Sequence, residues 1–227
     1  MLEKPNYKVN KNMPMPDRFI NGQALGMVSR LRYGLFPMSY NGCEIIAVYN
    51  YMRLHGVKTN IADLALEIYP KGSVLMGLFG SNPYMLRHYF QKRGMSEHGI
   101  TDYERFKREF PKAGSAIISF WTKRPLLSSL HTVAVESMEN GGVRVYNFSN
   151  SRTDPRELSG FDDFVKKSSH FIIGYIKQAF KSKTVCLYSR VVVDFKRYFT
   201  GRAGGRVSNR RSSDSSLLHR SRSRSRM

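Results

Sequence analysis

The sequence predicts an α+β fold, with helices in the first half of one domain and antiparallel strands in the second half. Up to residue 110, apolar residues recur at the 3.6-residue spacing of amphipathic helices. After residue 115, short apolar runs with alternating residues replace this pattern. Asn140-Gly141 separates two of these runs, and this dipeptide is typical of a hairpin turn because it tolerates positive φ. The change of pattern therefore predicts helices packed on an antiparallel sheet.

Capping and breaking residues set the expected helix bounds. Asn60 and Asn82 are expected N-caps, and Thr101 caps the helix after them. Pro70 and Pro111 are expected to end the helices that precede them. The predicted helices are Ala24–Tyr33, Cys43–Leu54, Ile61–Tyr69, Pro83–Lys92, Asp102–Phe110 and Phe161–Val165.

The predicted strands carry the β-branched and aromatic residues of the second half of the domain. They are Ser115–Trp121, His131–Ser137, Val143–Phe148 and His170–Lys177. The second and third form a hairpin through residues 139–142. The segment Thr184–Phe199 is apolar but has no clear period.

The composition fits one globular domain with extensions. The chain has 227 residues, of which 41% are hydrophobic and 24% charged. We expect an irregular leader over 1–21, because of its three prolines, and a folded domain over 22–178. An extension of uncertain structure over 179–200 and a disordered Arg/Ser-rich tail over 201–227 complete the division.

Neither a secretory signal peptide nor a membrane-spanning segment is expected from the sequence. It contains no run of about 18 apolar residues, so no transmembrane helix is expected, and its first residues have no signal-peptide core. Two cysteines, Cys43 and Cys186, are too few for a disulfide scaffold or a four-cysteine zinc site. We therefore expect a reduced, cytoplasmic compartment and no metal or other cofactor.

The net charge of +20 is concentrated near the C-terminus. Residues 179–227 hold 13 of the 37 basic residues and 2 of the 17 acidic residues. Such a tail can bind an anionic partner such as nucleic acid or an acidic surface, or can serve only as a solvated tail. No RNA-binding fold is recognisable before it.

Cys43 is the candidate nucleophile. It begins the strongest predicted helix, where the positive end of the helix dipole is expected to lower the pKa of its thiol. A cysteine in a helix can equally be inert packing. A catalytic role requires a base, and among the six histidines His131 is best placed, since it opens a strand.

Asn147 is the candidate that orients His131. The hairpin returns Val143–Phe148 beside the strand of His131, which brings Asn147 close to the histidine. Its side-chain carbonyl can accept the imidazole N–H and fix the tautomer. Taken alone, each of these two residues could be an ordinary strand-end residue. Tyr40, Trp121 and Phe148 flank them and could line a cleft or pack in the core.

In their order, Asn41-Gly42-Cys43, His131-Thr-Val-Ala-Val and Val143-Arg-Val-Tyr-Asn147 resemble the papain-like cysteine peptidase superfamily. The closest branch is the peptidase C39-like one, found in some bacteriocin-processing bacterial transporters, and the resemblance covers residues 34–177. It implies cleavage of peptide bonds through an acyl-enzyme on Cys43. His131 would be the base and then the acid, and Asn147 the orienter.

The sequence departs from this family beside the nucleophile. The glutamine that usually precedes the cysteine by about six residues is replaced by Pro37, which has no side-chain donor for the oxyanion. Asn41, Ser39 and Gln23 are the alternative oxyanion candidates. Glu44 adds a negative charge next to the thiol and opposes its ionisation.

These observations together predict a thiol hydrolase, a C39-like cysteine peptidase, whose partner is a peptide or small amide substrate. One alternative keeps the fold as an acyltransferase or as an inactive binding domain. A second alternative is a basic protein that binds nucleic acid or an acidic surface through its tail.

Overall fold

A computed structural model describes residues 2–178 except 16, 79, 123–128 and 168–169. These residues belong to one compact unit. The predicted extension over 179–200, the Arg/Ser-rich tail and Cys186 lie outside the described residues. No helix of the described part is long and apolar enough to cross a membrane.

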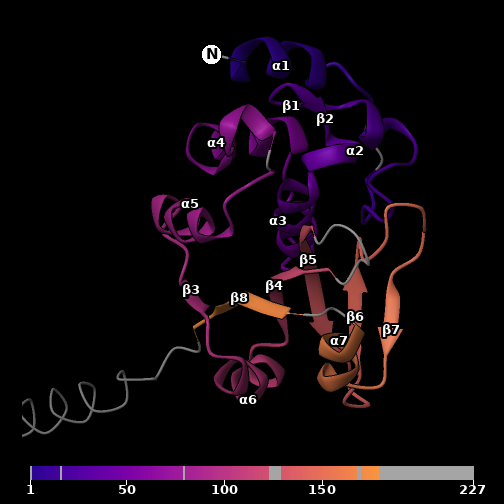
Figure 1. Cartoon of the computed structure of the whole chain (residues 1–227), viewed down its shortest axis with the longest axis vertical. Coiled ribbons are helices and arrows are strands. Elements are labelled where there is room, and N and C mark those ends of the chain that lie inside the picture. Colours follow the sequence, from indigo (N-terminus) through magenta and orange to yellow (C-terminus); the bar gives the residue numbers. More distant parts are fainter. Residues whose placement is uncertain (1, 16, 79, 123–128, 168–169, 179–227) are drawn as a thin grey trace, which may run out of the picture. The chain divides into compact units, whose positions relative to one another are not determined.

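A six-stranded antiparallel sheet in the order β3-β8-β4-β5-β6-β7 forms the centre of the unit (Figure 1). The strands are β3 (Glu97–Ile100), β4 (Ser115–Trp121), β5 (Leu130–Ser137), β6 (Val143–Tyr146), β7 (Arg156–Leu158) and β8 (His170–Lys177). Two further strands, β1 (Arg32–Tyr33) and β2 (Phe36–Pro37), pair with each other directly before the helix that begins at Met38. The predicted α+β class is confirmed, although the short strands β3 and β7 have no clear signal in the sequence.

Helices cover both faces of the sheet (Figure 1). The helices are α1 (Glu3–Asn10), α2 (Met38–Asn41), α3 (Cys43–Leu54), α4 (Ile61–Gly72), α5 (Leu86–Lys92), α6 (Tyr103–Ala113) and α7 (Phe161–Lys167). Short 3₁₀ turns span Met27–Arg30, Leu75–Gly77 and Pro83–Met85.

Each face of the sheet has its own apolar cluster, because successive residues of a strand point to opposite sides. On β4, Ile117 packs in the cluster that holds α3 and α4, while Ile118 packs in the cluster that holds α6. On β5, Ala134 packs in the first of these clusters and Val133 in the second. The sheet is therefore covered on both sides, and α3, which begins at Cys43, lies against β5, which carries His131.

The leader was expected to be irregular, and this expectation is wrong at α1. Pro5 is the third residue of α1, where the backbone N–H has no helical partner, so the proline removes no hydrogen bond. The Asn10 side chain exchanges two hydrogen bonds of 2.8 Å with the backbone of Arg32. This contact ties the end of α1 to β1.

Helix bounds differ from the prediction where the structure continues through a proline. α4 contains Pro70 and α6 contains Pro111, both in the last turn of their helices. Asp102, not Thr101, caps α6 by accepting the N–H of Arg105. The predicted helix Ala24–Tyr33 is wrong in length, since only Met27–Arg30 form a 3₁₀ turn before β1 begins.

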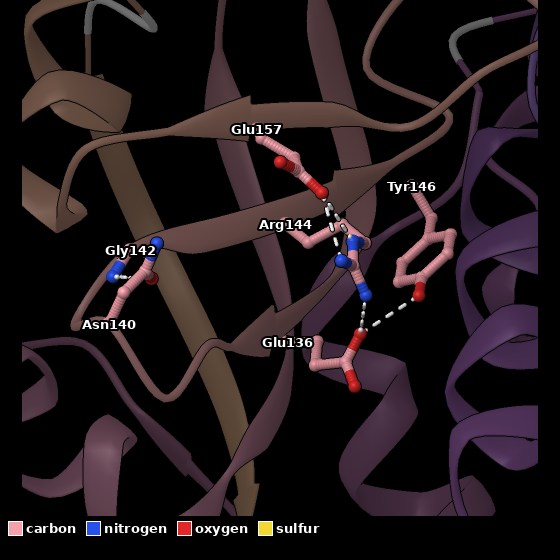
Figure 2. Close-up of polar contacts among 6 residues, drawn as sticks. All are labelled: Glu136, Asn140, Gly142, Arg144, Tyr146 and Glu157. Carbon is pink, nitrogen blue, oxygen red and sulfur yellow. Dashed lines mark hydrogen bonds and ion pairs between the residues drawn. The ribbon is translucent and has the colours of Figure 1, made fainter.

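The hairpin of β5 and β6 has the predicted turn, with Gly141 at a φ of 80°. Across this turn, the N–H of Gly142 donates to Oδ1 of Asn140 at 3.0 Å (Figure 2). Beside it, the Arg144 guanidinium on β6 donates to Glu136 on β5 at 3.2 Å and to Glu157 on β7 at 2.8 Å (Figure 2). The Tyr146 hydroxyl donates to the same Glu136 carboxyl at 2.9 Å. This network spans three strands and fixes the register that brings the end of β6 to His131.

Candidate active site

A cavity of about 870 Å³ opens between the N-terminal end of α3 and the sheet. Cys43 and His131 both line it, although 88 residues separate them in the sequence. The three aromatic residues that flank them in sequence, Tyr40, Trp121 and Phe148, line it as well. The structure therefore brings the predicted nucleophile and the predicted base to one cavity.

Cys43 is the first residue of α3, and Gly42 is its N-cap. A side chain at Gly42 would collide with Met38, so glycine lets α2 pass directly into α3 at the required angle. The Cys43 side chain is partly exposed in the cavity. The close succession of the two helices thus presents the sulfur at the cavity wall.

The pKa of the Cys43 thiol is not lowered as the helix dipole suggests. Burial of the thiol and, to a smaller extent, the nearby Glu44 carboxyl raise it to about 11. The backbone N–H groups of Thr132, Glu44 and Cys43 itself act in the opposite direction. Desolvation is the largest contribution, so the resting thiol is protonated at neutral pH.

His131 is held by the main chain of Asn147. Its Nε2 atom lies 2.8 Å from the carbonyl oxygen of Asn147. Because a carbonyl only accepts, this nitrogen carries the proton of the neutral ring, and Nδ1 has the lone pair. The ring of Phe120 contacts the imidazole edge-on, with 5.7 Å between centroids. His131 is thereby fixed in the tautomer of a proton acceptor.

The orienting contact predicted for the Asn147 side chain is made by its main chain instead. The side chain is fully buried and turns to Gln23, whose N–H it accepts at 3.1 Å and to whose Oε1 it donates at 3.1 Å. Its backbone has a positive φ of 58°, which directs the carbonyl towards the histidine. The predicted hairpin correctly brought Asn147 next to His131, but no pattern in the sequence indicates the positive φ of Asn147.

Asn147→Ala is expected to lower the free energy of unfolding by about 2–4 kcal/mol, as measured by urea denaturation. The change leaves the backbone N–H and Oε1 of Gln23 without partners in the interior, and alanine is strained at positive φ. Asn147→Gly also loses the hydrogen bonds to Gln23, but glycine is not strained at positive φ. Its free energy of unfolding should therefore fall by about 1 kcal/mol less than that of Asn147→Ala. Equal stability of the alanine variant and the wild type would contradict this description of Asn147.

The three oxyanion candidates all line the cavity, but they differ in whether a side-chain proton remains available to donate. Asn41 donates to the carbonyls of Tyr33 at 2.8 Å and Gly77 at 3.0 Å, which commits both of its amide protons. Gln23 donates one amide proton to the Ser39 carbonyl at 3.0 Å and has a second. The side chains of Gln23 and Ser39 therefore retain a donor, whereas that of Asn41 does not.

Other residues of the cavity escaped the sequence analysis. Ser81 lies before α5, Arg152 and Asp154 come from the connection between β6 and β7, and Arg156 begins β7. The Arg156 guanidinium lies 4.9 Å above the ring of Phe148. Only the fold joins these segments to Cys43, so no local pattern could have indicated them. Among the described residues, no cluster of three His, Cys, Asp or Glu could hold a metal ion.

No protein-family model and no curated protein matches this chain. Among solved structures it is similar to the peptidase domain of Streptococcus ComA, a bifunctional ABC transporter involved in quorum sensing. The sequence identity is 13%, the match covers 64% of this chain and 97% of that chain, and the TM-score is 0.45.

It is also similar to a protein from Bacillus anthracis named as a C39-like peptidase. Here the identity is 17%, the match covers 61% of this chain and 90% of that chain, and the TM-score is 0.38.

Proposed function

We propose that this protein is a thiol hydrolase that cleaves a peptide or small amide through an acyl-enzyme on Cys43. One observation carries the proposal: Cys43 and a His131 fixed in the proton-accepting tautomer line the same cavity. A nucleophile, a base and a group that orients the base are the minimum for this chemistry. The cavity has room for several residues of an extended peptide.

The protonated resting thiol determines the first step. With the thiol pKa at about 11, a preformed thiolate is scarce, so His131 accepts the Cys43 proton as the sulfur attacks the carbonyl carbon. The S–C bond forms, and the carbonyl electron pair moves to its oxygen. The second amide proton of Gln23 and the backbone N–H of Cys43 are the donors we assign to that oxygen.

The later steps return the proton. The tetrahedral intermediate collapses, the C–N bond breaks, and His131 gives its proton to the leaving amine. Water then attacks the thioester carbon while His131 accepts a proton from it. The C–S bond breaks, His131 returns this proton to the sulfur, and the acid product leaves. In an acyltransferase, an amine or alcohol would replace this water.

The test is to trap the acyl-enzyme. Short N-acylated peptide nitrophenyl esters should add one acyl group to the full chain, visible as an intact-mass shift, and peptide mapping should locate it on Cys43. Cys186 is the internal control for unspecific acylation of a thiol. Acylation of both cysteines at the same slow rate would overturn the proposal.

One observation favours a second candidate, a binding domain that uses the same cavity without hydrolysis. The raised pKa of Cys43 leaves the free protein with little thiolate at neutral pH. In that case the esters should leave Cys43 unmodified, while peptides still bind the cavity and protect it from proteolysis.

A further inference from the structure

Glu44 is a buried carboxyl group for which the proposed mechanism has no use. It follows Cys43 on α3 and is only 1% exposed. Within the described part of the chain, neither of its carboxyl oxygens has a hydrogen-bond partner, and no lysine or arginine forms an ion pair with it. A buried acid without a partner beside a nucleophile calls for a functional explanation.

The groups around Glu44 supply no positive charge. The hydroxyl of Ser81 is close enough to favour the ionised carboxyl slightly, but it donates to the Tyr33 hydroxyl at 3.3 Å. Tyr33 on β1 and Tyr175 on β8 face the same region, and burial raises the pKa of both phenols, so they stay neutral. The adjoining cavity wall holds His131 on β5 together with Tyr40, Arg152, Asp154 and Arg156. Among the described residues, none of these side chains forms a hydrogen bond or ion pair with the Glu44 carboxyl.

An isolated carboxylate in such surroundings takes up a proton rather than stay charged. Burial accordingly raises the pKa of Glu44 to about 8. At neutral pH the side chain is a neutral carboxylic acid, and at alkaline pH it acquires a negative charge one residue after Cys43 at the start of α3. That charge is one of the factors that raise the pKa of Cys43.

We propose that Glu44 is a positioning residue kept as a neutral carboxylic acid beside Cys43, and that its ionisation at alkaline pH suppresses the reactivity of the Cys43 thiol. Two adjacent negative charges at one buried helix start repel each other, so only one of the two groups ionises readily. The proposal deepens the proposed function, since it sets the alkaline limit of the same nucleophile.

The test is the rate of Cys43 alkylation by iodoacetamide between pH 6 and pH 10, in the wild-type chain and in Glu44→Gln. Glutamine has nearly the same shape and never ionises in this range. The ratio of the Glu44→Gln rate to the wild-type rate is expected to rise about tenfold or more between pH 7 and pH 10, because each unit of thiol pKa changes the thiolate fraction about tenfold. Peptide mapping separates Cys43 from Cys186.

Glu97→Gln is the matched control. Glu97 is 5% exposed and accepts a hydrogen bond from Tyr51, so it is a second buried glutamate, but it lies towards the other end of α3. The ratio of the Cys43 alkylation rate in Glu97→Gln to that in the wild type should stay constant between pH 6 and pH 10. A constant ratio for Glu44→Gln as well would overturn the proposal.

Infrared spectroscopy tests the same point without any variant. The wild-type chain should show the carbonyl band of a neutral carboxylic acid at pH 7, and this band should vanish above pH 9. Absence of the band at pH 7 would also overturn the proposal. Both readouts follow the thiol and the carboxyl rather than peptide cleavage, so they remain decisive if no hydrolysis is found.

Discussion

Cys43→Ala is expected to abolish peptide cleavage, with kcat/KM reduced roughly 10⁴-fold or more, because the acyl-enzyme cannot form without the sulfur. The measurement is hydrolysis of the peptide nitrophenyl ester, or of a peptide substrate once one is known. The alanine side chain fits the space of the cysteine, so circular dichroism and urea denaturation should show an intact fold.

Cys186→Ala is the matched control, since it removes the chain's other thiol from a segment outside the described residues. Its kcat/KM should equal that of the wild type. If Cys43→Ala retains cleavage while Cys186→Ala loses it, the nucleophile is assigned to the wrong cysteine.

Glu44→Gln is expected to change how stability depends on pH. The folded chain holds the Glu44 proton up to about pH 8, whereas the unfolded chain releases it near the ordinary pKa of 4.5. Between these values the folded state binds more protons than the unfolded state, so wild-type stability falls as pH rises. Below pH 4.5 and above pH 8 this group adds no further slope.

The expected size follows from about 1.4 kcal/mol for each pH unit. Between pH 5 and pH 8 the wild-type chain should lose up to about 4 kcal/mol relative to Glu44→Gln, as measured by urea denaturation at several pH values. All other titrating groups are the same in both chains and cancel. Parallel curves for the two chains would show that Glu44 ionises normally in the folded state.

Much of the fold could be predicted because its signals are local. The apolar periodicity after Cys43 predicted α3, and Asn140-Gly141 predicted the hairpin. The structure differs where tertiary packing outweighs local preference. Pro70 and Pro111 lie in the last turns of α4 and α6, and tertiary packing keeps these turns helical. Likewise, α1 forms although it contains Pro5. Short strands such as β7 owe their form to the neighbours with which they pair.

The candidate site was predictable in its members and less so in its chemistry. Cys43 and His131 do line one cavity, and Asn147 does lie at the histidine. Which atom of Asn147 contacts the ring depends on a backbone angle, and the pKa of Cys43 depends chiefly on the burial of its thiol. Both properties depend on how the interior packs, and they cannot be predicted from the order of residues along the chain.

The central claim is that the imidazole of His131 activates the thiol of Cys43. It is tested most directly by the single-turnover rate of Cys43 acylation with the peptide nitrophenyl ester, in the wild type and in His131→Ala. His170→Ala, which removes an exposed histidine from β8, is the control. We expect His131→Ala to be acylated about a hundredfold or more slowly and His170→Ala to match the wild type. Equal rates for His131→Ala and the wild type would contradict the account.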